Sequence, residues 1–196
     1  MVLKDTKSHI TLVTSGACDQ LKYLHSKFPM FNYTLLASDQ QIVSISKKYF
    51  YCEISSNIKV SAGDSLEKIS TQEKPSNLII LDSPNIDAGS TLAFPPKEFV
   101  ENVKVLRDGL TNDGILVVNI GCRVEDMKKE IKEKFKTEFK IACCIESESK
   151  MGSLLFLSDR ENLKEEILDA GKEVKARLGL SDGTLENLCF MLSAIH

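Results

Sequence analysis

The sequence predicts an α/β fold, a doubly wound and mostly parallel seven-stranded sheet with an antiparallel last strand. Apolar runs typical of strands alternate with helical patterns along most of the chain, which is typical of parallel sheets covered by helices. The last two runs, 139–145 and 153–158, are joined only by a short polar link, Glu146 to Gly152. A parallel crossover needs a dozen or more residues, so this pair is expected to form an antiparallel hairpin.

The first half of the chain contains four candidate strands, which lie at 9–14, 31–37, 58–62 and 77–82. Helical patterns separate them: one at 20–27, one opening at Asp39, and one after Asp64-Ser-Leu-Glu67, which has the form of a capping box. The fourth strand is a continuous run of apolar β-formers. It is therefore expected to be buried on both faces, as central parallel strands are.

The second half continues the alternation. A helix is predicted at 96–110; Pro95-Pro96 opens it, and it ends near Asn112-Asp113-Gly114. A strand at 115–120 and an amphipathic helix from Val124 through Phe135 follow. The hairpin comes next, and then a helix from Leu163 to Leu178. The tail, 184–195, is apolar and weakly helical, so we expect it to dock on the domain. The whole chain, 1–196, is expected to form one domain.

Composition narrows the classes of partner. The 25 basic and 28 acidic residues leave a net charge of −3. The overall electrostatic potential therefore gives no indication of binding to nucleic acid or to an anionic membrane. No apolar run approaches the roughly 18 residues of a membrane span, and the first residues lack a signal-peptide core, so we expect a cytoplasmic protein. The six cysteines have no metal-ligand spacing, and Cys143 and Cys144 should face opposite sides of a strand. No metal site is expected.

The fourth strand ends at a carboxylate, Asp82, which a proline-containing turn and a long loop follow. Open α/β sheets bind ligands in the crevice outside the carboxyl ends of their strands, so Asp82 is a candidate site residue. An equally good interpretation is that Asp82 closes an Asx turn over Ser83-Pro84. Spacing alone does not separate the two.

Five segments occur in a characteristic order: Asp39 with Tyr49-Phe50, Ala62-Gly-Asp64, Asp82, Phe94-Pro-Pro-Lys-Glu-Phe-Val100, and Gly114-Ile-Leu-Val-Val-Asn119-Ile-Gly-Cys122-Arg123. They resemble the spermidine-synthase-like branch of the class I S-adenosylmethionine-dependent methyltransferases. Within it, the chain resembles the C-terminal domain of the dual lysine and N-terminal methyltransferases of elongation factor 1-alpha. In that family a strand ending in Asp precedes Cys-Pro-Pro-x-x-Phe-Val, and a later strand reads Asn-x-x-Cys-Arg.

The resemblance implies a Rossmann-like methyltransferase fold, S-adenosylmethionine as cofactor and an amine acceptor on a protein, of the elongation-factor type. It assigns the cofactor to seven residues, with Asp82 also catalytic: Thr14, Ser15 and Gly16 at the methionine part, Asp39 near the ribose, Asp64 with Ser65 at the adenine, and Asp82 at the reaction centre. The 83–94 loop would line the acceptor channel. Asn119 and Arg123 would support the floor of the site or polarise its rim. An equally good interpretation of Arg123 is that it caps a helix or pairs with Glu125 or Asp126.

The chain also departs from the family pattern. Gly16 is the only glycine of a loop that is glycine-rich in the family, and the family's acid near the end of the second strand aligns with Ala37. Asp39 and Asp64 stand where helix N-caps belong, a role that needs no ligand. Pro84 replaces the second acid of the polyamine synthases, which argues against aminopropyl transfer. The second hypothesis is therefore a non-catalytic relative, kept as a binding or scaffolding module.

Overall fold

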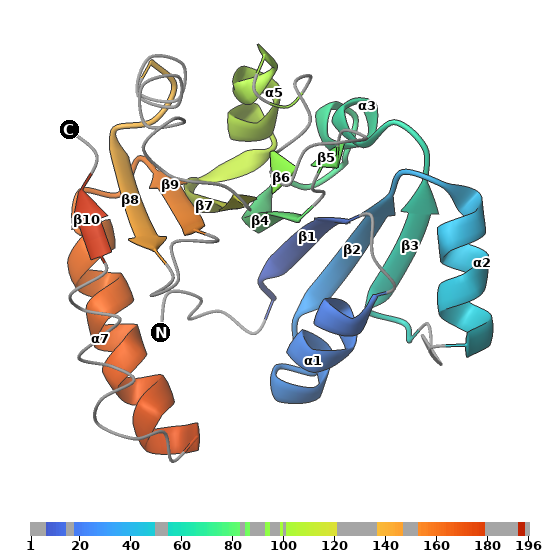
Figure 1. The fold of residues 1–196 in the computed structure, drawn as a ribbon, viewed down its shortest axis with the longest axis horizontal. Helices are drawn as coiled ribbons and strands as arrows, with labels where there is room; N and C mark the ends of the chain where they lie inside the picture. Colours follow the sequence, from blue (N-terminus) through green and yellow to red (C-terminus); the bar gives the residue numbers. More distant parts are fainter. Residues whose placement is uncertain are drawn as a thin grey trace.

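The computed structural model describes residues 7–14, 18–49, 55–82, 85–86, 93–94, 99, 101–120, 137–146, 153–178 and 192–194 (Figure 1). The strands are β1 (His9–Thr14), β2 (Asn32–Ala37), β3 (Ile58–Ala62), β4 (Ser76–Asp82), β5 (Asn85–Ile86), β6 (Ala93–Phe94), β7 (Leu110–Ile120), β8 (Ile141–Glu146), β9 (Ser153–Ser158) and β10 (Leu192–Ala194). The helices are α1 (Asp19–Lys27), α2 (Gln40–Tyr49), α3 (Ser65–Ser70), α5 (Val103–Asp108) and α7 (Leu163–Leu178).

The main sheet has the order β3-β2-β1-β4-β7-β9-β8-β10 (Figure 1). Strands β3, β2, β1, β4 and β7 are parallel, and β9 runs antiparallel to both β7 and β8. The predicted doubly wound sheet of seven strands with an antiparallel last strand is confirmed. The short β10 adds an eighth strand at the edge, and β5 and β6 form a separate antiparallel pair within the predicted loop after Asp82.

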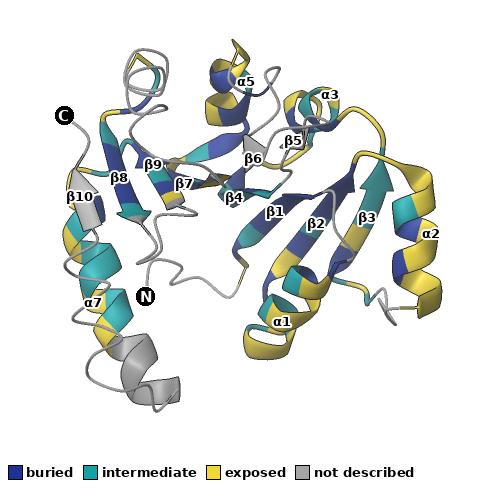
Figure 2. Ribbon diagram, in the orientation of Figure 1, coloured by how far each residue is buried: buried dark blue, intermediate teal, exposed yellow. Residues whose placement is uncertain are grey.

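The two faces of the sheet bury separate apolar clusters because successive strand residues point to opposite faces. On one face Ile10 and Leu12 of β1 pack with Leu21 of α1, and on the other Val13 packs with a cluster that includes Leu106 of α5. Figure 2 shows buried residues along the strands and exposed residues on the outer faces of α1 and α2. Cys143 and Cys144 belong to clusters on opposite faces, as predicted.

The structure corrects two boundaries. Helix α5 ends at Asp108 with Gly109 as its C-cap, so the stop predicted near Asn112-Asp113-Gly114 is wrong. A Cβ atom at Gly109 would clash with the side chain of Ile69 of α3, so this position favours a glycine, and the chain turns there. Residues 110–114 instead lengthen β7, with a register shift opposite Ser76 and Leu78.

The second correction concerns the tail. Residues 192–194 form β10 and pair with β8, so the expected docking is confirmed, but the helical expectation is wrong for these residues. The unpaired edge of β8 offers backbone hydrogen bonds that outweigh a weak helical propensity. The helix predicted from Val124 and the Pro95-Pro96 opening lie outside the described residues. None of the helices described is both long and apolar enough to cross a membrane.

Candidate active site

Four parallel strands end in one row. Thr14, the last residue of β1, is in register with Asp82 of β4 on one side and with Ala37 of β2 on the other, and Ala37 is in register with Ala62 of β3. The turns after these strands therefore start from a common carboxyl edge. Neighbouring strands are about 4.8 Å apart, so this row extends over about 14 Å from Asp82 to Ala62.

Asp82 is held at one end of this row by side chains from two other elements. Asn119 of β7 donates a hydrogen bond from Nδ2 to Asp82 Oδ1 at 2.7 Å. Gln20, in the first turn of α1, donates from Nε2 to Asp82 Oδ2. Each oxygen of an ionised carboxylate has two lone pairs, so both keep an acceptor site for a ligand. Ser83 and Pro84, over which an Asx turn would close, lie outside the described residues.

Asp64 lies in the turn after β3 and is the N-cap of α3, as its sequence pattern predicted. Its Oδ1 accepts from the backbone N–H groups of Leu66 at 2.9 Å and Glu67 at 3.1 Å. Gly63, just before it, has φ +116° and donates its N–H to the carbonyl of Ala37 at 3.0 Å. This turn is therefore tied to the end of β2, which fixes Asp64 at the carboxyl edge. Ser65, the first residue of α3, is buried.

Asp39 lies at the start of α2, where its Oδ1 accepts from the backbone N–H of Gln41 at 2.7 Å. The side chain is exposed. Ala37, which the resemblance aligns with the family's acid, is buried in the sheet. Asp39 is thus the carboxylate next to the end of β2, and like Asp64 it uses one oxygen as a helix cap.

The loop after β1 bears on whether a cofactor fits. Thr14 is buried at its start, whereas Ser15 and Gly16 lie outside the described residues. Cys18, at its end, has the left-handed backbone conformation, φ 42° and ψ 17°, that favours glycine. Its side chain is buried in the cluster that contains Ile10 and Leu21. At this position the chain keeps a glycine-like turn, and the thiol is accommodated in the core.

The charges at this edge are predominantly acidic; the side chain of Lys68, beside the turn at Gly63, is a basic exception. Acidic residues stand at the end of β4 and at the starts of three helices, where the positive end of the helix dipole favours them: Asp19, Asp39, Asp64, Glu67 and Asp82. In the part of the chain that the structure describes, none of these five forms an ion pair with a lysine or arginine. An edge of this kind favours a cationic ligand over a phosphate-bearing one.

The structure brings together most of the predicted site residues that it describes. Thr14 and Asp82 are adjacent in the sheet, and Asp39, Asp64 and Ser65 lie in neighbouring turns on the same edge. Asn119, predicted as a supporting residue, contacts Asp82 directly. Arg123 lies outside the described residues. Sequence reasoning missed Gln20, although the first turn of the helix after β1 faces the carboxyl edge in any doubly wound sheet.

No protein-family model matches this chain. The sequence is similar to that of the eEF1A lysine and N-terminal methyltransferase of Danio rerio, with 23% identity over 142 residues, which are 69% of this chain and 21% of that protein. The chain thus spans about a fifth of the length of this relative. The match confirms the resemblance to methyltransferases of elongation factor 1-alpha.

Solved structures agree with this fold. Human methyltransferase-like protein 13, in complex with SAH (S-adenosylhomocysteine), superposes with a TM-score of 0.76 at 18% identity, covering 92% of this chain and 88% of that one. A probable spermidine synthase from Corynebacterium glutamicum superposes with a TM-score of 0.66 at 22% identity, covering 80% of this chain and 57% of that one. The Rossmann-like methyltransferase fold of the spermidine-synthase-like type is therefore shown.

Proposed function

We propose that this protein is an S-adenosylmethionine-dependent methyltransferase that acts on an amine of a protein. The observation that carries the proposal is the arrangement at Asp82. Gln20 and Asn119 fix this carboxylate at the carboxyl edge, and each of its oxygens keeps an acceptor site for a ligand. The fold and the sequence match to eEF1A methyltransferases support the same activity. The acceptor that these relatives suggest is eEF1A, which would place the reaction in the cytoplasm.

The proposed cofactor residues follow the row of strand ends. Thr14, Ser15 and Gly16 would hold the methionine part, Asp39 the ribose, and Asp64 with Ser65 the adenine. The roughly 14 Å from Asp82 to the end of β3 is long enough for an extended nucleoside with its methionine arm. Asp39 and Asp64 each use one carboxylate oxygen as a cap, and the other oxygen accepts no hydrogen bond from a described residue.

The chemistry asked of the protein is mainly alignment. When bound, S-adenosylmethionine would supply a methyl group on a sulfonium. The lone pair of a neutral amine would form the N–C bond in line with the breaking C–S bond, S-adenosylhomocysteine would leave, and the ammonium product would lose a proton to solvent. Asp82 would accept an N–H of the acceptor amine, which orients the lone pair and stabilises the positive charge that develops on nitrogen. The 83–94 segment, with β5 and β6, follows Asp82 directly and would line the acceptor channel. The proposed domain is the whole chain, 1–196.

Calorimetric titration with S-adenosylhomocysteine tests the cofactor. We expect measurable heat and a rise in melting temperature, because a ligand that binds only the folded state stabilises it by mass action. Incubation with S-adenosylmethionine and eEF1A, followed by mass spectrometry, then tests the acceptor. No heat and no thermal shift at millimolar ligand would contradict the enzyme.

Two variants of Asp64 separate ligand binding from capping. Serine is nearly as good an N-cap as aspartate, so Asp64→Ser keeps the cap and removes the carboxylate, whereas Asp64→Ala removes both. If Asp64 binds the cofactor, both variants lose affinity for S-adenosylhomocysteine and only Asp64→Ala loses stability. If Asp64 is only a cap, Asp64→Ser binds as the wild type does.

A non-catalytic binding module is the second candidate, and specific observations favour it. Asp39 and Asp64 both cap helices, which is a structural role that needs no cofactor. Ala37 aligns with the acidic residue that contacts the ribose in the family. This candidate predicts that the folded protein gives no response to S-adenosylhomocysteine in either the calorimetric or the thermal measurement.

A further inference from the structure

The contacts of Asp82 define a role for two amide side chains. Gln20 comes from the first turn of α1 and Asn119 from β7, on opposite sides of the carboxylate in the order of the sheet. Each donates one N–H to a different oxygen of Asp82. A carboxylate that is held at both oxygens by donors on two elements cannot turn about its last torsion angle without breaking a hydrogen bond.

The chemical type of these donors matters. Lysine or arginine would also hold the carboxylate, but they would neutralise it. An amide is a neutral donor, so Asp82 keeps its full negative charge while its orientation is fixed. Of the residues that the structure describes, none places a positive charge on Asp82.

We propose that Gln20 and Asn119 are positioning residues that hold Asp82 as an oriented, uncompensated carboxylate for an amine acceptor. This inference rests on the proposed function and adds two residues to the site. The remaining acceptor sites of Asp82 face a substrate nitrogen that gains positive charge as it is methylated, so the site favours an amine over a neutral hydroxyl. Such a fixed and unneutralised charge is most effective where water is excluded.

A purely structural role is the competing explanation. The Gln20 hydrogen bond joins α1 to β4, so it also braces α1 against the sheet. Replacing Gln20 alone disturbs both the brace and the charge, and activity alone does not separate them. The test therefore has to restore the hydrogen bond without restoring the position of the charge.

Exchanging the two groups does this. The double variant Gln20→Glu with Asp82→Asn keeps an amide opposite a carboxylate, and the new amide oxygen at position 82 still accepts from Asn119. Of the single variants, Gln20→Glu breaks the pairing by setting two carboxylates against each other, whereas Asp82→Asn keeps a hydrogen bond because the Gln20 amide can turn its oxygen toward the new Nδ2. Gln40→Glu is the matched control, since it adds the same charge to the first turn of α2, two strands away from Asp82.

The expected result is a split between readouts. Melting temperature should return to its wild-type value in the exchanged variant, and affinity for S-adenosylhomocysteine should equal that of Asp82→Asn alone. Methyl transfer to the amine should stay reduced by about tenfold to a hundredfold, the size of a charge-assisted hydrogen bond. Asn119→Leu should raise the KM of the acceptor and lower kcat with cofactor affinity unchanged. Gln40→Glu should leave all three quantities unchanged.

The outcomes that overturn the inference are distinct from failure of the proposed function. A wild-type protein that binds no S-adenosylhomocysteine removes the enzyme and this inference together. A wild-type protein that binds and transfers methyl groups, with an exchanged variant that is fully active, shows that Gln20 is only a brace. Wild-type kinetics in Asn119→Leu would exclude that residue from positioning.

Discussion

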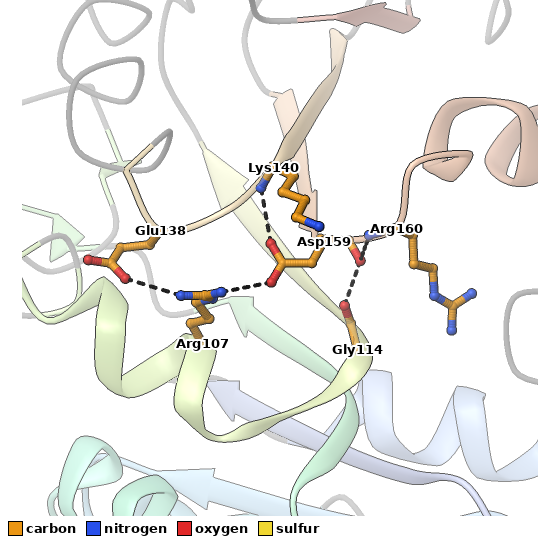
Figure 3. Close-up of polar contacts among 7 residues, drawn as sticks. Arg107, Gly114, Glu138, Lys140, Asp159 and Arg160 are labelled. Carbon is orange, nitrogen blue, oxygen red and sulfur yellow. Dashed lines mark hydrogen bonds and ion pairs between the residues drawn. The ribbon is translucent and has the colours of Figure 1, made fainter.

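The two edges of the sheet carry aspartates in opposite surroundings. At the amino edge, Asp159 follows β9, and its Oδ2 accepts from Arg107 Nη2 at 2.9 Å while its Oδ1 accepts from the backbone N–H of Lys140 at 3.1 Å (Figure 3). Arg107 also lies 3.8 Å from Glu138. At the carboxyl edge, Asp82 is held only by neutral amides among the described residues.

Further polar groups next to Asp159 at the amino edge are paired as well. Arg160 pairs with Glu166 at 2.7 Å and donates from Nε to the carbonyl of Asp113. Buried Ser158 donates to the carbonyl of Gly114 at 2.8 Å. These contacts join α5, β7, β8, β9 and the start of α7. The amino edge uses its charges to connect elements, whereas the aspartates of the carboxyl edge form no ion pair within the part of the chain that the structure describes.

The ion pair and hydrogen bonds at the amino edge lower the pKa of Asp159. Burial opposes ionisation, but the hydrogen bonds from Arg107 and the N–H of Lys140 outweigh it, so the pKa lies below its ordinary value of 3.8. A paired carboxylate of this kind stabilises the fold. A carboxylate that is held but not neutralised keeps its charge for a ligand, and natural proteins often accept lower stability at such sites.

The same substitution at the two edges should have opposite effects, and the larger one is at Asp82. Asp82→Asn keeps the shape and removes the charge, so we expect methyl transfer to fall by roughly tenfold to a hundredfold, or about 1.5–3 kcal/mol. The free energy of unfolding, from urea denaturation, should stay the same or rise because an acidic edge loses repulsion. An Asp82→Asn variant that is destabilised but fully active would show that Asp82 stabilises the fold and is not needed for methyl transfer.

The turn that carries Asp64 at the carboxyl edge needs a positive φ angle at Gly63, which glycine adopts without strain. With φ at +116°, a side chain there is strained even though its nearest neighbour, Lys68 Cε, would lie at an ordinary contact distance of 3.6 Å. We expect Gly63→Ala to lower the free energy of unfolding by about 2 kcal/mol and to weaken S-adenosylhomocysteine binding, because the turn that carries Asp64 moves. Asp64→Ser is the control that removes the carboxylate without strain. Unchanged stability would mean that the turn relaxes to negative φ at little cost.

Asp159→Asn should show the reverse pattern to Asp82→Asn. We expect a loss of about 1 kcal/mol in the free energy of unfolding with methyl transfer unchanged, a modest value because solvent screens the half-exposed Arg107. Because the folded pKa is depressed, this stabilisation is complete above pH 3.8 and is lost as the pH falls through the folded value. Urea denaturation of both proteins from pH 7 to pH 2 should show the two curves converging in acid.

Much of the fold could be predicted from sequence because the local residue patterns favour the same helices and strands that the topology of the sheet requires. The strand at His9–Thr14 and the cap at Asp64 are set by their own residues and a few neighbours. The end of α5 could not be located, because it depends on the contact of Gly109 with Ile69, far away in sequence. For the same reason β10 was missed, since its conformation is set by pairing with β8.

The candidate site divides in the same way. Asp39, Asp64 and Asp82 were predicted because each ends or begins an element, and that position is visible in the sequence. Gln20 was missed because no local pattern distinguishes it from the other polar residues of α1. Its significance comes only from Asp82, which the register between β1 and β4 brings close to it.

Tyr33 gives the smallest effect and tests whether the amino edge is stabilised beyond its ion pairs. Its hydroxyl donates to the last carbonyls of α1, with distances of 3.2 Å to Leu24 and 2.8 Å to Phe28. We expect Tyr33→Phe to lower the free energy of unfolding by about 0.5–1 kcal/mol without affecting methyl transfer.

The pH dependence of the same variant sharpens the test. Burial raises the pKa of Tyr33 from 10.0 to about 12, so the neutral phenol is favoured in the folded state. Its contribution is complete below pH 10, the value in the unfolded chain, and is lost as the pH rises toward 12. Between these limits the wild type should lose its advantage over Tyr33→Phe, and the ultraviolet titration of tyrosinate should lose its latest step in the variant. A constant difference in stability across this range would mean that the hydroxyl is not buried, and that the C-terminus of α1 is held by packing alone.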